Sequence, residues 1–249
     1  MKDGTTYFLG SGNLQMARLD SSDNPLGYSD PANATRLELN VETETKEVKS
    51  RMRDTFGQTL ASATLITDAT VAMTFNGITP DLFANIFLGD LVDITDAGGS
   101  ITDESVIMHA GKWSRVATPG SGISAVTVTN STGATTYDET TDYELDADAG
   151  LIKPVSGGGI GDGDTVLVDY TYGALTGSKV TGATRPLVNV AIIFSGKNVY
   201  TGQPAKVEVF KASIRPSSAV DFLSEDTQEL QFEGKLITPA GRSWPFEII

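Results

Sequence analysis

The sequence contains no cysteine and only one histidine, His109. Without cysteine there is no disulfide framework, no thiolate nucleophile and no thiolate metal site. A single histidine cannot form the cluster of a zinc or copper site. We expect His109 to be a structural residue in a strand over residues 106–116. We therefore expect no metal or other cofactor and no catalytic site.

Long apolar runs and a surplus of positive charge are absent too. No apolar run approaches the roughly 18 residues that cross a bilayer, and the segment after Met1 lacks the apolar core of an export signal. We therefore expect no membrane partner and no Sec export. The chain has 32 acidic and 18 basic residues, a net charge of −14, which disfavours gripping phosphates. Such a charge suits solubility and self-repulsion before assembly, or a surface past which DNA slides.

Motifs that would suggest an enzyme are incomplete. The segment 173–179 resembles a phosphate loop, but its spacer is short and Ser178 separates the last glycine from Lys179. The acidic turn 162–164 lacks the remaining ligands of a calcium loop. Many carboxylates could pair as a glycosidase acid and nucleophile, but a sequence alone cannot show such a pair. We predict that the protein is not an enzyme.

The residue pattern predicts an all-β, mostly antiparallel fold with one short helix. Runs rich in Val, Ile and Thr recur between turn residues, as in the segments 188–194 and 206–212. Residues 228–237 alternate strictly, with Leu230, Phe232 and Leu236 on one side and charged or polar residues on the other. A period of two predicts a strand with one buried and one hydrated face.

Two local signals refine this pattern. Thr79 followed by Pro80 predicts the start of the helix, with the hydroxyl as its N-cap, an apolar stripe facing a sheet, and Gly89 near its end. The run Gly10-Ser11-Gly12 lacks the third glycine of a dinucleotide fingerprint. We interpret it as a turn between two strands.

Residues 118–175 differ in amino-acid composition from the rest of the chain. They contain nine acidic residues against a single basic one, Lys153, and glycine-rich turns separate their short strands. We predict that they form a small acidic β-sandwich inserted into a discontinuous main domain of residues 1–117 and 176–249.

Residues 43–62 form a second distinctive segment, which we call the arm. It is rich in charge of both signs and nearly free of large apolar residues, so it cannot anchor itself in a core. Two interpretations stay open: a solvated hairpin or flexible loop, and an inter-subunit arm that orders only against a neighbouring copy. Its charged residues are Glu44, Lys46, Glu47, Lys49, Arg51, Arg53 and Asp54.

The order of these segments resembles the major tail tube proteins of long-tailed bacteriophages. The resemblance rests on the runs VAIIFSGKNVYTGQP (190–204), VEVFKA (207–212), PSSAVDFLS (216–224) and ELQFEGKL (229–236). The N-terminal half agrees, with LELNV at 37–41, the charged arm, and a strand over residues 64–76 before a short helix. Residues 133–172 are similar to the Ig-like domain inserted in some members.

The resemblance implies a structural virion protein. Such subunits form hexameric rings that stack into a tube around a continuous inner β-barrel. The tube encloses the tape measure protein, joins tail-end proteins and passes DNA without binding it specifically. The implied localisation is the virion tail, with assembly in the host cytoplasm. Under this reading the residues expected to face the lumen are Glu229, Gln231, Glu233, Glu38, Asn40 and Glu42. The arm is expected to reach the adjacent ring.

The main alternative is a surface glycan-binding or adhesin-like β-sandwich. That function requires exposed aromatic rings as a sugar platform. The candidates in the insertion are Tyr137, Tyr143, Tyr170 and Tyr172.

Overall fold

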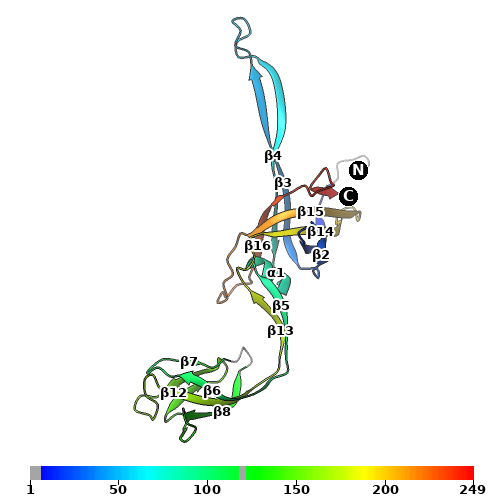
Figure 1. Cartoon of the computed structure of the whole chain (residues 1–249). Coiled ribbons are helices and arrows are strands. Elements are labelled where there is room, and N and C mark those ends of the chain that lie inside the picture. The colour runs from blue at the N-terminus through cyan, green and yellow to red at the C-terminus, as the bar shows by residue number, and fades with distance from the viewer. Residues whose placement is uncertain (1–6, 118–121) are drawn as a thin grey trace. The chain divides into compact units, whose positions relative to one another are not determined.

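The computed structural model describes residues 7–117 and 122–249 (Figure 1). It divides the chain into two compact units. Unit 1 comprises Met1–Val92 and Val180–Ile249, and unit 2 comprises Asp93–Lys179. The strand pairs of the three larger sheets are antiparallel, and the described residues contain one short helix. The all-β prediction is confirmed.

Unit 1 is built on one eight-stranded sheet. Its strands follow the spatial order β2-β1-β14-β15-β16-β4-β3, and β17 pairs with part of β15. Over the described residues the sheet stays open and does not close into a barrel within one chain. The strands are β1 (Gly10–Leu19), β2 (Pro25–Tyr28), β3 (Ala34–Lys49), β4 (Thr59–Phe75), β14 (Val188–Asn198), β15 (Pro204–Pro216), β16 (Leu230–Leu236) and β17 (Phe246–Ile248).

Strand β16 shows the predicted alternation. Leu230, Phe232 and Leu236 are buried in the core of unit 1, whereas Gln231 and Lys235 are exposed. The ring of Phe232 meets that of Phe75 on β4 edge to face, with centroids 6.0 Å apart. The apolar face of the sheet therefore holds unit 1 together, because burying each large side chain contributes about 1.5–3 kcal/mol.

The helix α1 (Pro80–Ile86) begins where the sequence predicts. The Thr79 hydroxyl accepts a hydrogen bond from the backbone N–H of Leu82 at 3.3 Å. Leu82 and Ile86 are buried in the same core as β16, and the helix contacts β15 and β16. The helix ends at Ile86, three residues before the predicted Gly89, and Leu88 takes the positive φ of the turn that follows.

The prediction of a turn at Gly10-Ser11-Gly12 is wrong. These residues open strand β1, and Gly12 pairs directly with Gly196 of β14. A Cβ atom on Gly12 would lie 2.5 Å from the Gly196 Cα. Glycine is needed here because two backbones approach closely, which is a second reason for glycine in a sequence besides a turn.

Unit 2 is a sandwich of two small sheets around its own core. The four-stranded sheet has the order β6-β12-β8-β9 and the three-stranded sheet the order β10-β11-β7. Buried residues from both sheets, including Val128 and Ile152, form one cluster. The strands are β6 (Gly99–Ile107), β7 (Ser114–Arg115), β8 (Ile123–Asn130), β9 (Thr136–Tyr137), β10 (Tyr143–Asp146), β11 (Leu151–Pro154) and β12 (Thr165–Tyr172).

The boundaries of unit 2 differ from those predicted for the insertion. The predicted start, residue 118, lies outside the described residues, and the unit begins at Asp93. Strands β6 and β7 belong to it because they pair with β12 and β11. Its end at Lys179 lies close to the predicted 175. Two further strands, β5 (Asp90–Asp96) and β13 (Leu175–Thr181), pair with each other where the chain passes between the units.

The same region corrects the expected strand over residues 106–116. Strand β6 ends at Ile107, and His109 lies exposed in a turn in which its carbonyl accepts a hydrogen bond from the Lys112 N–H. The structure thus places the one histidine outside a core. Within the described ranges, none of the helical segments is both long and apolar enough to span a membrane.

Asp142 links two loops of unit 2 and gives that unit a predicted acid sensitivity. Its carboxylate accepts backbone hydrogen bonds from Asp138 and Gly159 at 2.9 and 2.7 Å. These bonds hold the pKa of Asp142 below its ordinary value. A lowered folded-state pKa means that the stabilisation is complete above the unfolded pKa of about 3.9. It is lost as the pH falls through the lower folded value.

We therefore expect Asp142→Asn to destabilise unit 2 at pH 7 and to flatten its stability profile at acid pH. Urea unfolding followed across the acid range measures both effects. Asp148→Asn, at an exposed carboxylate of the same unit, is the matched control. Equal acid profiles for Asp142→Asn and the unmodified protein would contradict the assignment.

Candidate functional site

The hydrated face of the unit 1 sheet gathers five of the six residues predicted to face a lumen. Register places Glu38 and Glu233 on either side of Ala72, and Asn40 and Lys235 on either side of Thr70. Gln231 lies opposite Thr74, which also pairs with Arg36. We call this surface the charged face: Arg36, Glu38, Asn40, Glu42, Asp68, Thr70, Ala72, Arg215, Gln231, Glu233 and Lys235.

Ion pairs neutralise most of the carboxylates on the charged face. Arg215 lies 2.6 Å from Glu233, and Lys235 lies 3.0 Å from Asp68. Arg36 donates to Glu38. The hydrogen bond from Lys235 is the main reason that the pKa of Asp68 falls below its ordinary value. Three basic and four acidic side chains leave the face close to neutral, because each acidic residue except Glu42 has a basic partner.

Glu229 lies outside strand β16, although the sequence predicts a strand over residues 228–237. It is exposed but precedes the first residue of β16 and belongs to the loop before that strand. Its backbone carbonyl accepts a hydrogen bond from the Ser218 hydroxyl at 3.3 Å. The structure therefore separates Glu229 from the paired part of the charged face.

Strand β3 is an open edge of the unit 1 sheet. It is 16 residues long and pairs with β4 on one side only, whereas the opposite edge strand, β2, has four residues. Between the irregularities at Ala34/Arg36 and Glu42/Thr43, its register with β4 is regular. That stretch contains no proline, glycine or lysine. Soluble proteins usually protect such an edge, because its free N–H and C=O groups pair readily with another strand.

Unit 2 protects its own long edge strand, β6. A bulge with a positive φ at Asp103 interrupts its register with β12. Next to the bulge, the Glu104 carboxylate accepts a hydrogen bond from the Ala117 N–H at 2.6 Å. Bulges and inward-held charges are standard protection for a sheet edge. Between Arg36 and Glu42, strand β3 has no bulge of this kind.

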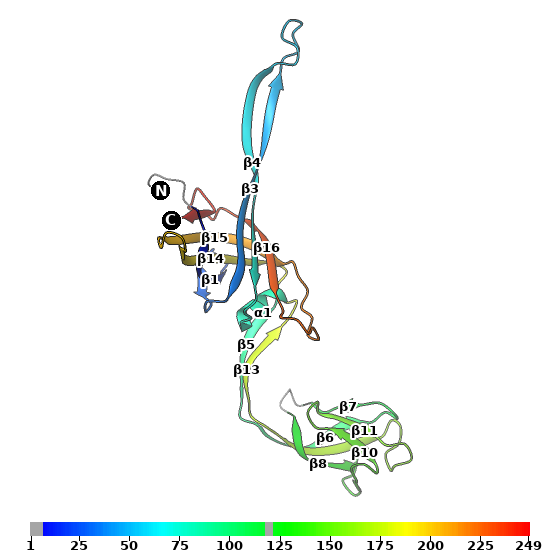
Figure 2. The same cartoon turned by 180° about the vertical axis from the view of Figure 1, so that it is seen from behind.

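The arm is a two-stranded ribbon that continues β3 and β4 beyond the sheet (Figures 1 and 2). Pairing persists up to Lys49 and Thr59. Within the described chain, no residue from 43 to 66 belongs to either core cluster. The structure thus shows a hairpin, as in the first of the two interpretations of the arm. Isolated two-stranded hairpins are marginal in water, so the ribbon gains most if a neighbouring surface covers it.

All seven charged arm residues are exposed, but the arm has two faces and a tip. Alternation along β3 places Glu44 and Lys46 on one face and Glu47 and Lys49 on the other. The remaining three, Arg51, Arg53 and Asp54, lie in the tip turn.

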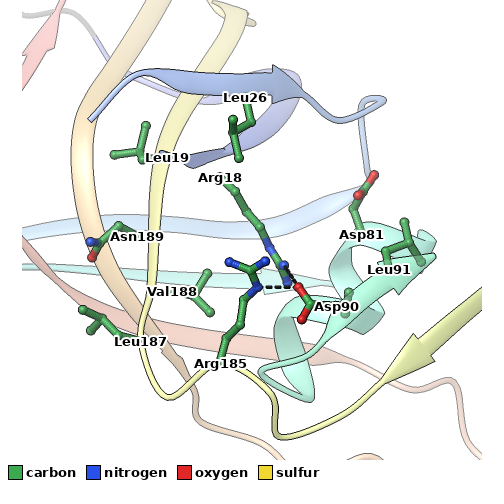
Figure 3. Close-up of a pocket in the computed structure, with 11 residues that line it drawn as sticks. Arg18, Leu19, Leu26, Asp81, Asp90, Leu91, Arg185, Leu187, Val188 and Asn189 are labelled. Carbon is green, nitrogen blue, oxygen red and sulfur yellow. Dashed lines mark hydrogen bonds and ion pairs between the residues drawn. The ribbon is translucent and has the colours of Figure 1, made fainter. Parts of the chain in front are cut away.

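A pocket beside helix α1 has a structural role (Figure 3). Its volume is about 240 Å³. In it, Arg18 donates to the Asn85 side chain and to the Gly89 carbonyl, each at 2.7 Å. Arg185 pairs with Asp90, which lowers the pKa of that carboxyl. Burial lowers the pKa of Arg18. Because protein groups occupy these donors, Arg18 ties β1 to α1 and Arg185 ties the segment before β14 to β5.

The proposed tyrosine platform of the alternative function is largely internal. Tyr143 and Tyr170 are 3% and 2% exposed, and Tyr137 and Tyr172 pack against the same core. Across residues 7–117 and 122–249, no group of three or more His, Asp or Glu side chains is arranged to hold a metal ion.

A family model described as protein of unknown function UCP028589 matches residues 7–242. The chain belongs to this family. No curated protein matches it. The match spans both units, so the arm, the open edge and unit 2 all lie within one family pattern.

Sequence reasoning missed the basic partners on the charged face. Arg215 reaches Glu233 only because β15 and β16 pair with Arg215 opposite Glu233. Alternation along β16 places Lys235 on the hydrated side, but its partner Asp68 lies on β4, far away in sequence. Alternation along a strand predicts which face of the sheet a side chain lies on. Which side chain lies beside it depends on the register between strands that are distant in sequence.

Proposed function

We propose that this protein is a structural virion protein that self-assembles into stacked rings, forming the tail tube of a long-tailed bacteriophage. The observation that carries the proposal is the regular, unprotected edge of β3. Pairing that edge with a strand of the next copy would satisfy its free backbone groups and continue the sheet around a ring. Six copies per ring is the number that the family resemblance implies.

The charged face supports the proposed role as a conduit. If it lines the bore, its paired charges present a nearly neutral surface to DNA, and affinity for DNA grows with the number of phosphates neutralised by free cations. The tape measure protein would occupy this bore before infection and tail-end proteins would close it. Unit 2 would decorate the outside. Assembly would take place in the host cytoplasm, with the finished tube in the virion.

Negative-stain microscopy of the purified full chain over a concentration series tests the proposal. We expect rings or tubes of uniform diameter once the concentration suffices for association. A monodisperse monomer at every concentration, by sedimentation as well as microscopy, would overturn the proposal.

The neutrality of the charged face gives a further prediction. Changing Asn40 and Gln231, both exposed, to lysine adds two positive charges per copy to the proposed bore. We expect tubes of this double variant to retain double-stranded DNA at low salt and to release it as salt rises. Fluorescence anisotropy with a labelled duplex measures the retention.

The matched control is Asn40→Thr with Gln231→Thr, which changes the same two residues and keeps both side chains neutral. We expect tubes of this control variant not to retain DNA. If lysine tubes also ignored DNA at low salt, the charged face would not line the bore.

A further inference from the structure

The tip of the arm, residues 49–58, is a folded turn with a net positive charge. Lys49, Arg51 and Arg53 give it positive charge in an acidic chain, with Asp54 its one acidic residue. Met52 and Phe56 are 72% and 75% exposed. The turn is held internally, because the buried Ser50 bonds through its hydroxyl to Thr55 at 2.7 Å and through its N–H to the Gln58 carbonyl at 2.7 Å. A preorganised turn loses little entropy when it docks.

A surface of opposite character lies in the loop of residues 217–229, the acidic loop. It carries Asp221, Glu225, Asp226 and Glu229 and no basic residue. None of these four takes part in an ion pair within the described part of the chain.

The acidic loop also presents apolar side chains on a firm support. Phe222 and Leu223 are 73% and 93% exposed. The Phe222 ring stacks on Phe87 with centroids 6.1 Å apart and meets Phe83 edge to face. The Asp221 carboxylate accepts a hydrogen bond from the Leu223 N–H at 2.9 Å, which fixes the turn. Exposed apolar side chains rimmed by charge are typical of a protein interface.

The two surfaces lie at opposite ends of unit 1. The acidic loop leads into Leu230, which pairs with Phe75 at the C-terminal end of β4. The arm tip joins the other end of β4, at Thr59. A strand of 17 residues separates them, roughly 55 Å at 3.3 Å per residue. Figures 1 and 2 show the same arrangement, with the arm and the α1 end pointing away from each other within unit 1.

We propose that the arm tip of one copy docks on the acidic loop of the next copy along the stack. This inference rests on the proposed function and names the surface that receives the arm. The opposite charges and exposed apolar groups of the two surfaces complement each other. Two tips meeting symmetrically would repel, so the contact is head to tail. A head-to-tail contact leaves a free arm tip at one end of the assembly and a free acidic loop at the other. Further copies can therefore add, and the contact propagates into a filament.

Charge reversal tests the contact. Arg51→Glu with Arg53→Glu makes the tip acidic, and Glu225→Lys with Asp226→Lys and Glu229→Lys makes the loop basic, with Asp221 its one remaining acidic residue. Each of these two charge-reversal variants alone faces like charges at every junction. We expect each to need at least roughly tenfold more protein to form tubes, since like charges across an interface are strongly unfavourable.

Mixing the two charge-reversal variants gives the sharper result. Each mixed junction joins either two unmodified surfaces or two reversed ones, so both kinds are complementary. We expect equimolar mixtures to form tubes near the unmodified concentration. Asp138→Lys with Glu139→Lys, at exposed residues of unit 2, is the matched control and should assemble normally without a partner. Circular dichroism and thermal melts verify that every variant is folded.

Cross-linking supplies an independent readout, because the native chain contains no cysteine. A chain with Met52→Cys and a chain with Leu223→Cys should form a mixed disulfide when assembled together, and neither should dimerise efficiently alone.

The outcomes separate this inference from the proposed function. Tubes formed by unmodified protein together with normal assembly of both charge-reversal variants, or failure of the mixture to recover, would overturn the docking contact alone. Absence of rings and tubes from unmodified protein would instead overturn the proposed function.

Discussion

Replacing residues 43–67 with an Asn-Gly turn is expected to leave a folded subunit that forms no tubes. Glu42 and Asp68 are directly paired, so a two-residue turn can join their strands without changing register. The removed ribbon contributes no residue to either core cluster of the described chain. Its loss should therefore change the stability of unit 1 little while removing the tip that joins successive copies. Microscopy and sedimentation of the purified variant measure the effect.

Two outcomes of the deletion are informative about the arm. Rings without tubes would agree with the account, because the edge of β3 from Arg36 to Glu42 is retained. Tubes of normal length would show that the arm is dispensable for stacking. As a control for folding, the urea unfolding curve of unit 1 in the deletion variant should match that of the full chain.

Phe232→Ala is expected to cost unit 1 about 3–5 kcal/mol of stability, the usual range for truncating a buried phenylalanine. The Phe232 side chain is 1% exposed and packs edge to face on Phe75. Its removal leaves a cavity between β16 and β4, the two strands that carry the centre of the charged face. Equilibrium unfolding in urea, followed by a signal specific to unit 1, measures the loss.

The adjacent Gln231→Ala provides a matched control. Gln231 is exposed on the opposite face of the same strand, and a surface substitution of this kind usually changes stability by less than about 0.5 kcal/mol. If Phe232→Ala cost less than about 1 kcal/mol, the apolar face of β16 would not be the main support of the sheet.

Local patterns in the sequence predicted the elements of unit 1 well. Alternation in residues 228–237 gives the buried and hydrated faces of β16 because side chains on a strand switch sides at each residue. Thr79 and Pro80 give the start of α1 because the capping interaction is local. Such signals depend only on neighbours along the chain.

Features that depend on distant neighbours were not predicted. Gly12 needs its small size because Gly196 lies opposite it, and nothing near Gly12 in sequence indicates that pairing. The start of unit 2 was placed too late for the same reason, since β6 belongs to it only through pairing with β12. Within the site, the face of Glu233 was predictable, whereas its neutralisation by Arg215 was not.

The open edge of β3 also lies beyond local sequence patterns. Residues 36–41 show the alternation of any half-buried strand, and their position at the end of the sheet order is a property of the whole topology. The resemblance to tail tube proteins supplied the expectation of inter-subunit pairing. The structure contributes a named strand, β3, that is free to make such a pair.

The most direct test of the account is a cryo-electron microscopy reconstruction of the particles that the purified full chain forms. We predict a ring in which residues 36–42 of β3 hydrogen-bond to a strand of the neighbouring copy, with Glu38 and Glu233 facing a central channel. A reconstruction in which the edge of β3 faces solvent and the copies meet through other surfaces would contradict the account.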